Sequence, residues 1–377
     1  MADIKTILRE LSVILGYILS KYDLEFTTEI LNVKKYLEFI RKYCKNINEC
    51  NSEIQKIEQE ENLMVHKSII GNGLNLGQIL YEKLKLDGDI VWSGAQVKSK
   101  YPFDIKIGNT GISLKEASFI LKNPSFSNYL NALTQPSIPF VKVHVFRSFA
   151  EKEFKLWFDY TFMKLKEIAT KCKDNEKIFI YSKRGTFIKR LKDKLIFGDA
   201  DNEISISMEG QINEIELNKR LGGFIFEHTF SKWIKDNLEK NDNRYNELKK
   251  TCSLKAGENL KNYIYENLNL NSREILELMQ IYDENYYYGK SFGEAKIYKV
   301  PKNIECKVEL TNIEVKVPSS QLNVYFTFKI SNINGINDVE FRVECRYSHG
   351  QFKGIPEAKL YYTDDINHLR NLYMEIN

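Results

Sequence analysis

The sequence lacks the features that mark several protein classes. Its six cysteines are scattered with no CxxC pair, and none of its five histidines is spaced for a zinc knuckle, so we expect reduced thiols and no structural metal. No window reaches the roughly 18 apolar residues of a membrane span, and the first residues do not follow the order of a signal peptide. We therefore expect a soluble, cytoplasmic protein with no membrane partner.

A large excess of charge of one sign is also absent. The chain has 55 Lys and Arg against 51 Asp and Glu, which leaves a net charge of only +4, so a polyanion would have to meet a local basic patch. There is no Gly-Lys-Ser/Thr loop for nucleotide phosphates and no Gly-x-Ser-x-Gly elbow for acyl chemistry. What the sequence does have is 43% hydrophobic content over 377 residues, enough for one large or two ordinary domains.

The hydrophobic pattern divides the chain into three regions of an α/β (α+β) protein. Residues 1–70 are predicted to be helical, because apolar residues recur there at intervals of three and four. Residues 71–282 begin with a Gly/Asn-rich joint at 71–77 and then mix strands with helical insertions, which predicts a sheet core flanked by helices. Residues 283–377 alternate like antiparallel strands and predict a β-rich subdomain.

The expected elements of the core begin with three closely spaced strands, of which the last two are joined by the hairpin signal Asn109-Thr110-Gly111. A buried strand and a long amphipathic helix follow. A further strand, a basic helix and a mainly helical stretch complete the region. These elements are predicted, in chain order, at 89–93, 102–108, 112–118, 138–146, 149–172, 177–182, 189–194 and 222–282.

One group of polar residues on the predicted hairpin has the composition of a catalytic site. Asp104 lies near the end of one strand, and Ser113 and Lys115 share a face of the next, because side chains alternate along a strand. Carboxylates can hold Mg²⁺, and a lysine can orient the water that attacks a phosphodiester. Glu82, on the helix before the first strand, could supply a second carboxylate. We therefore expect Asp104 and Glu82 as metal ligands.

This pattern resembles the PD-(D/E)xK nuclease superfamily, whose largest group is the type II restriction endonucleases. The family has an acid, a hairpin and then acid-x-Lys, preceded by a helix that often carries a glutamate. Asp104 looks like the first acid, with Phe103 inserted after the proline, Lys115 like the terminal lysine, and Glu82 like the helical glutamate. The resemblance covers about a fifth of the chain and implies a restriction-endonuclease-like sheet core.

The departure from the family pattern is Ser113, which occupies the position of an acid. Some restriction enzymes resemble this chain in having Ser-x-Lys there, with the missing carboxylate supplied from elsewhere. Glu82 is the first choice for that carboxylate, whereas Glu116 would point to the other face of its strand. A second frame takes Asp89 as the first acid and Asp104-Ile-Lys106 as the Asp-x-Lys. A solvated ion pair between Asp104 and Lys115 is the structural alternative.

A second polar cluster lies near the C-terminus. Residues 340–359 alternate Arg and Glu on one strand and then turn through Ser-His-Gly. Arg, His, Gln and Lys side chains read purine edges and grip phosphates, whereas a salt-bridged edge hairpin is the structural alternative. The residues predicted to contact DNA are Arg342, Arg346, His349, Gln351, Lys353 and Lys359.

The resemblance implies a type II site-specific deoxyribonuclease of a restriction-modification system, a hydrolase that uses Mg²⁺ to cut double-stranded DNA. Lys115 would position the attacking water, and Ser113 would contact a metal-bound water or the phosphate. We expect a homodimer in a bacterial cytoplasm, the host being suggested by the Asn/Lys/Ile-rich composition. The alternatives are a structure-specific repair nuclease and a DNA-binding or scaffold protein that has lost catalysis.

Overall fold

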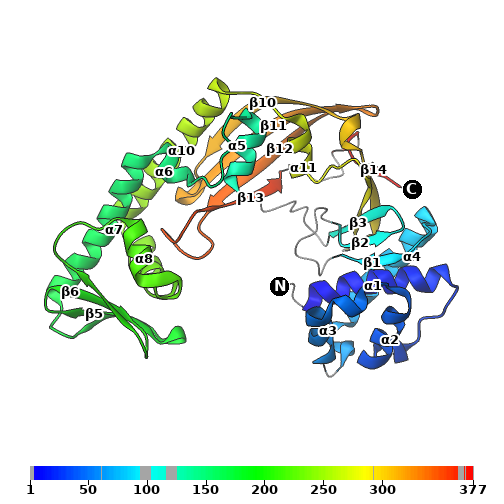
Figure 1. The fold of residues 1–377 in the computed structure, drawn as a ribbon, viewed down its shortest axis with the longest axis horizontal. Coiled ribbons are helices and arrows are strands. Elements are labelled where there is room, and N and C mark those ends of the chain that lie inside the picture. The colour runs from blue at the N-terminus through cyan, green and yellow to red at the C-terminus, as the bar shows by residue number, and fades with distance from the viewer. Residues whose placement is uncertain are drawn as a thin grey trace.

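The computed structural model describes residues 4–60, 62–93, 103–115, 125–291, 293–363, 369 and 371–376. Within them the chain has the predicted mixed α and β fold, and its strands form three sheets that we call A, B and C. Figure 1 shows an arch, in which the N-terminal helices and sheet A form one end, sheet C forms the other, and sheet B lies between them. None of the described helices is long and apolar enough to cross a bilayer.

Sheet A is a mixed sheet flanked by helices. Its strand order is β1, β2, β3, β8, β9, β14, and β3 and β8 run parallel while the other neighbours are antiparallel. A parallel pair needs a crossover connection, and here the crossover contains sheet C and most of the later helices. The strands are β1 (Ile90–Trp92), β2 (Ile105–Ile107), β3 (Thr110–Lys115), β8 (Asn285–Lys290), β9 (Lys296–Val300) and β14 (Met374–Glu375).

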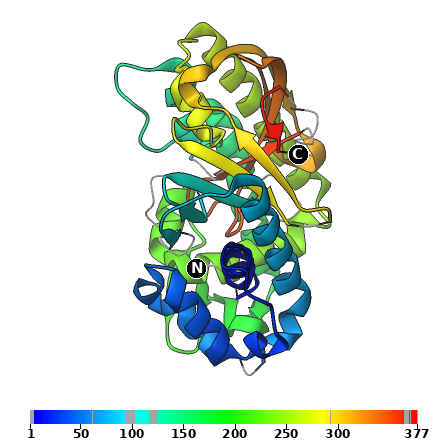
Figure 2. The ribbon, with the colours of Figure 1, turned by 90° about the vertical axis from the view of Figure 1, so that its right-hand side faces the viewer.

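The N-terminal helices cover one face of sheet A. Figure 2 looks along the axis of α1, which lies beside α4 against the sheet. Isoleucines of β2 and β3 share one hydrophobic core with the buried faces of these helices. The predicted helical region is thus part of the sheet's core. The helices are α1 (Ile4–Lys21), α2 (Val33–Tyr43), α3 (Asn51–Glu58) and α4 (Lys67–Leu84).

The Gly/Asn-rich stretch 71–77, predicted as a joint, is instead the middle of α4. Its glycines serve close helix packing. A Cβ added at Gly77 would lie 2.1 Å from the carbonyl oxygen of Val13, and one added at Gly16 would lie 2.2 Å from the carbonyl oxygen of Leu74. The contact between α1 and α4 therefore needs residues without side chains, and this packing outweighs the low helix propensity of glycine.

Sheet B confirms the predicted C-terminal antiparallel strands, in the order β10, β11, β12, β13. One face packs aromatic residues against helices of the main core, and the other carries polar side chains. Residues 283–377 also return β8, β9 and β14 to sheet A. The strands are β10 (Lys307–Lys316), β11 (Leu322–Asn332), β12 (Gly335–Arg346) and β13 (Glu357–Tyr362).

The helices of the main core belong to the stretch between β3 and β8. The amphipathic helix expected at 149–172 and the mainly helical stretch 222–282 are confirmed. In order, the helices are α5 (Phe126–Thr134), α6 (Val145–Phe149), α7 (Glu151–Lys171), α8 (Glu214–Ile225), α9 (Ser231–Ile234), α10 (Asn243–Glu266) and α11 (Ser272–Leu278).

The basic helix expected at 189–194 is wrong, because this stretch is part of a hairpin in sheet C. Ile188 is buried on the sheet, and Lys192 adopts a left-handed conformation (φ +53°) at the turn. Arg190 donates to backbone carbonyls at the end of α7, including that of Cys172 at 2.8 Å. The strands of sheet C are β4 (Lys177–Tyr181), β5 (Thr186–Leu191), β6 (Lys194–Gly198) and β7 (Glu203–Ser207).

The buried strand expected at 138–146 is also wrong. Ile138 and Val141 are exposed by more than four fifths, and α6 begins at Val145. The side chain of Asn131 accepts from the backbone nitrogen of Phe140 (2.8 Å) and donates to its carbonyl oxygen (2.9 Å). The side-chain amide of Asn131 thus makes the backbone hydrogen bonds to Phe140 that a neighbouring strand would have made.

Candidate active site

The hairpin of β2 and β3 brings together three of the predicted site residues. Ile105 pairs with Ile112, so the register places Asp104 opposite Ser113 and on the same face as Lys115. The Asp104 carboxylate accepts a hydrogen bond from the backbone nitrogen of Leu114 (2.6 Å) and one from Ser113 Oγ (3.4 Å). The carboxylate is therefore fixed against the strand that carries the lysine.

Lys115 is partly buried, at the end of β3. Its Nζ lies 3.4 Å from Gln280 Oε1 and 5.8 Å from the ring centre of Tyr288. Burial lowers the pKa of the Lys115 ammonium group, and the negative charge of Asp104 opposes that shift. The lysine is therefore held within the protein by an amide, an aromatic ring and a carboxylate.

Burial acts in the opposite direction on Asp104. It raises the pKa of this carboxyl, although the Leu114 amide and the charge of Lys115 pull the pKa down. Desolvation disfavours the charged form of both groups, while their mutual attraction favours it. Both Asp104 and Lys115 are half-buried, so a fully solvated ion pair, the alternative considered from the sequence, does not describe their surroundings.

The carboxylate beside Asp104 comes from α1 and was missed in the sequence. Glu10 is only 7% exposed, and its Oε2 accepts a hydrogen bond from Trp92 Nε1 at 2.8 Å. Burial, followed by the charge of Asp104, raises the pKa of Glu10 to about 8. A signal was present, because Glu10 lies at helical spacing from the buried residues Ile7 and Ile14, where an amphipathic helix normally places apolar side chains.

The structure does not bring Glu82 to the hairpin. Its side chain is exposed, accepts from Gln78 Nε2 at 2.8 Å, and lines a surface pocket with residues of α1 and α4. Two residues along a helix is a rotation of about 200°, so Glu82 faces away from the buried side marked by Leu80. The expected helical glutamate is therefore corrected from Glu82 on α4 to Glu10 on α1.

The second sequence frame does not assemble a site. Asp89 is exposed and forms an ion pair with Lys45, which lies outside the hairpin. Lys106 shares the face of Asp104 by strand alternation, whereas Asp89 lies before β1 and its carboxylate pairs with Lys45. Pro102 and Glu116, which were considered in the first frame, lie outside the described residues.

Two neighbouring carboxyls with raised pKa values, Glu10 and Asp104, form a position where binding of a cation would be favourable. Among the described residues there is no group of three or more His, Cys, Asp or Glu side chains suited to a metal. Mg²⁺, however, usually binds through one or two carboxylates and keeps several waters, which substrate phosphate oxygens can replace. Glu10 and Asp104 fit that ligand requirement in chemical type.

The residues predicted to contact DNA fall into two groups. Arg342, Arg346 and Lys359 lie on the polar face of sheet B, where alternation along β12 separates the arginines from the buried residues between them. The Arg342 guanidinium stacks 4.6 Å from the ring centre of Tyr361, and Arg346 lies 4.0 Å from Glu344. This face therefore carries cations, an aromatic ring and acids together.

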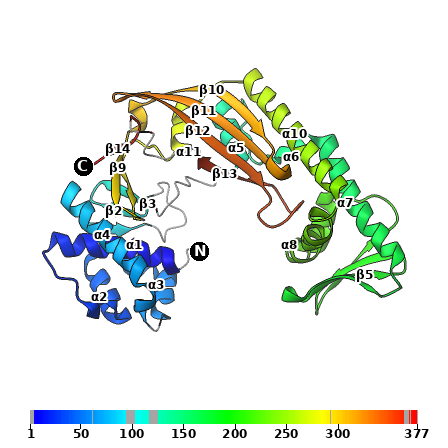
Figure 3. The same cartoon turned by 180° about the vertical axis from the view of Figure 1, so that it is seen from behind.

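The other group lies in the loop between β12 and β13, where each side chain already has an internal partner. His349 Nδ1 lies 3.3 Å from Glu227, and Lys353 Nζ donates to the same carboxylate at 2.7 Å. Gln351 donates to Glu239 at 2.7 Å. Figure 3 shows this loop on the inner side of the arch near α8. These contacts fix the loop to the region that follows α8.

Comparison with protein-family models, with curated proteins and with solved structures finds no match to this chain. The geometry of the hairpin and of α1 is therefore the basis for a functional proposal.

Proposed function

We propose that this protein is a magnesium-dependent endonuclease that hydrolyses phosphodiester bonds of double-stranded DNA at a short specific sequence, as a type II restriction endonuclease does. The observation that carries the proposal is that the buried Glu10 of α1 acts electrostatically on the half-buried Asp104 of a hairpin whose next strand presents Lys115. Buried carboxyls with raised pKa values beside a lysine are costly for stability, which favours a functional reason for them.

In this proposal Asp104 and Glu10 would hold Mg²⁺, which would supply charge neutralisation at the phosphate and a more acidic water. Lys115 orients the attacking water and places a positive charge beside the phosphate oxygens. Ser113 Oγ, already bonded to Asp104 at 3.4 Å, restrains the carboxylate on the face where the phosphate would lie. Asp104, Ser113 and Lys115 share one face of the hairpin, and Glu10 is contributed by α1.

The arrangement of the arch supports a double-stranded substrate. Figures 1 and 3 show β3 on the inner side of one end and the β12–β13 loop on the inner side of the opposite half. A duplex along this side could meet the catalytic hairpin and the loop together. A weak net charge of +4 suits discrimination, because non-specific binding to phosphates is mainly electrostatic. We also propose a homodimer, so that two sites cut the two strands, in a bacterial cytoplasm.

The test is cleavage of unmethylated phage DNA by the purified chain with Mg²⁺ or with EDTA. We expect discrete fragments only with Mg²⁺, and their loss in Asp104→Ala, Glu10→Gln and Lys115→Ala, each by about a hundredfold or more. Glu82→Gln is the matched control, because it makes the same change as Glu10→Gln on an exposed carboxylate. Circular dichroism confirms that each variant is folded.

Other outcomes separate the alternatives. Cleavage only of branched or mismatched DNA would replace sequence specificity by structure specificity. Binding to DNA that is unaffected by Mg²⁺ and is not followed by cleavage would contradict the enzymatic proposal and favour a binding protein. Loss of cleavage in Glu82→Gln but not in Glu10→Gln would overturn the assignment of the helical carboxylate.

A further inference from the structure

Gln280 lies between α11 and β8 and contacts the lysine of the proposed site from 165 residues further along the chain. Building on the proposed function, we infer that Gln280 is a positioning residue that holds the Lys115 ammonium group in the orientation needed for phosphodiester hydrolysis. Nothing in the sequence pattern singled it out, because a glutamine in a loop carries no motif.

The contact is made inside the protein. Gln280 is only 2% exposed, and its Oε1 lies 3.4 Å from Lys115 Nζ. Tyr288 of β8 is the register partner of Ser113 on β3, and its aromatic ring faces the ammonium group of Lys115. A buried ammonium group needs acceptors for its protons, and a neutral amide supplies one without abolishing the positive charge.

The backbone at Gln280 is in a conformation that glutamine rarely adopts. Its φ is +61°, in the left-handed region, where a residue with a side chain is strained and glycine is not. Local hydrogen bonds close this turn, from the nitrogen of Gln280 to Glu277 O (3.1 Å) and from Ile281 to Leu276 O (2.8 Å). Strain of this kind persists where the surrounding structure enforces it, and is frequent at functional sites.

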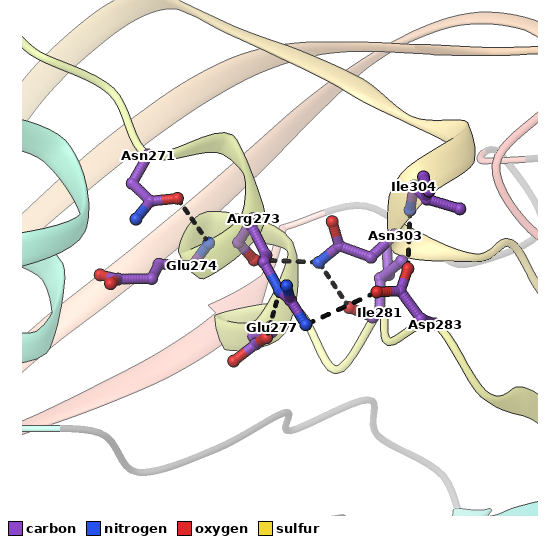
Figure 4. A network of polar contacts seen from close by, with 8 residues as sticks. All are labelled: Asn271, Arg273, Glu274, Glu277, Ile281, Asp283, Asn303 and Ile304. Atoms are coloured by element: carbon purple, nitrogen blue, oxygen red, sulfur yellow. Dashed lines mark hydrogen bonds and ion pairs between the residues drawn. The ribbon is translucent and has the colours of Figure 1, made fainter.

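A polar network around the turn provides that enforcement (Figure 4). The buried side chain of Asn303 donates to the carbonyl oxygens of Arg273 (3.0 Å) and Ile281 (3.3 Å). Arg273 in turn contacts Glu277 at 3.2 Å and Asp283 at 3.6 Å. Asp283 also accepts from the backbone nitrogen of Ile304 at 2.8 Å.

The network thus ties α11, the turn and the chain before β10 together on both sides of Gln280. It fixes the path of the backbone from which the Gln280 amide reaches Lys115. What distinguishes Gln280 from other left-handed residues such as the exposed Gln135 is that its side chain is buried and contacts Lys115.

The test compares Gln280→Gly and Gln280→Leu with Gln135→Gly. Gln135 is the matched control, because it also has a left-handed φ (+39°) at the end of a helix but is exposed. We expect Gln280→Gly to fold, because the strain that glycine relieves offsets part of the cost of removing a buried side chain. Its kcat for DNA cleavage should fall about tenfold or more with KM within about twofold, since misplacing a catalytic group by ~1 Å is costly. Gln135→Gly should leave kcat unchanged.

A second readout does not depend on activity. Titration of Lys115 by NMR of ¹³C-labelled lysine side chains should give a lower pKa in Gln280→Leu and a higher one in Gln280→Glu, which adds a negative charge. An unchanged Lys115 titration in both variants, or full kcat in Gln280→Gly, would overturn the inference. If the wild-type protein cuts no DNA while the titration shifts as expected, the proposed function fails and the contact stands.

Discussion

The indole Nε1 of Trp92, on β1, donates a 2.8 Å hydrogen bond to the carboxylate of Glu10, on α1. This bond fixes a buried acid beside Asp104, whose charge, together with burial, raises the pKa of Glu10 to about 8. At neutral pH the site therefore favours a proton on Glu10, and a divalent cation would have to displace it.

Glu10→Gln is expected to stabilise the metal-free protein at high pH. Because the folded-state pKa of about 8 lies above the ordinary value of 4.5, the stability that protonated Glu10 contributes is complete below pH 4.5 and is lost as the pH rises through 8. Glutamine keeps an acceptor for Trp92 and removes this loss. In EDTA the Tm of the variant should exceed that of the wild type by about 2 °C or more at pH 9 and match it near pH 5.

Thermal unfolding across this pH range checks the prediction, with Glu82→Gln as the control that changes an exposed carboxylate. A Glu10→Gln protein that is no more stable than the wild type at pH 9 would show that Glu10 ionises without cost.

Mg²⁺ should stabilise the wild-type protein more at pH 8 than at pH 6, because bound metal requires both carboxyls to lose their protons. A ligand at one hundred times its Kd adds about 2.7 kcal/mol to the free energy of unfolding. We expect Glu10→Gln and Asp104→Asn to lose most of this gain. The measurement is the Tm with and without MgCl₂ at each pH. An equal gain in all three proteins would place the cation elsewhere.

The hairpin could be predicted from the sequence, whereas the packing of the helical carboxylate against it could not, for a physical reason. Asp104, Ser113 and Lys115 are related by strand alternation and a short turn, so local rules bring them together. Glu10 reaches Asp104 only because α1 packs across sheet A, a contact over 94 positions that periodicity does not encode. Glu82 has the expected place in the chain order, but its position on the helix turns it to solvent.

The same distinction explains the misread elements. The basic residues of 189–194 predicted a helix, but the turn at Lys192 makes this stretch part of a β-hairpin. The stretch containing Gly77 was predicted to be a joint between elements, because the sequence does not show that this glycine is needed for the close contact with Val13. Local hydrophobic alternation thus predicted the β-rich C-terminal region, whereas it could not predict contacts between segments that are distant in the sequence.

Gly77→Ala is expected to destabilise the fold and, through it, the site. The new methyl group would lie 2.1 Å from the carbonyl oxygen of Val13, so α1 must shift away from α4 and carry Glu10 with it. Overpacking of this kind costs about 1–3 kcal/mol or more. Gly71→Ala is the control on the same helix, because an added Cβ there meets nothing within 4 Å. It should be neutral or stabilising by up to ~1 kcal/mol.

Urea unfolding of the two alanine variants measures both effects. Equal stability of the two would mean that α1 and α4 tolerate a wider separation than the structure has.

The polar face of sheet B and the β12–β13 loop should contribute differently to DNA binding. Arg342 stacks on Tyr361 with its guanidinium near the surface, whereas Lys353 already donates to Glu227 at 2.7 Å. We expect Arg342→Ala to weaken binding and to reduce the slope of log Kd against log salt by about 0.9 for each phosphate that the variant no longer neutralises. Lys353→Ala should change that slope less and lower the Tm, because it breaks an internal ion pair. Lys152→Ala, an exposed lysine of α7, is the control for total charge. Suppose that Lys353→Ala alters the salt dependence as strongly as Arg342→Ala does. Lys353 must then leave Glu227 to contact a DNA phosphate, and its ion pair with Glu227 exists only in the DNA-free protein.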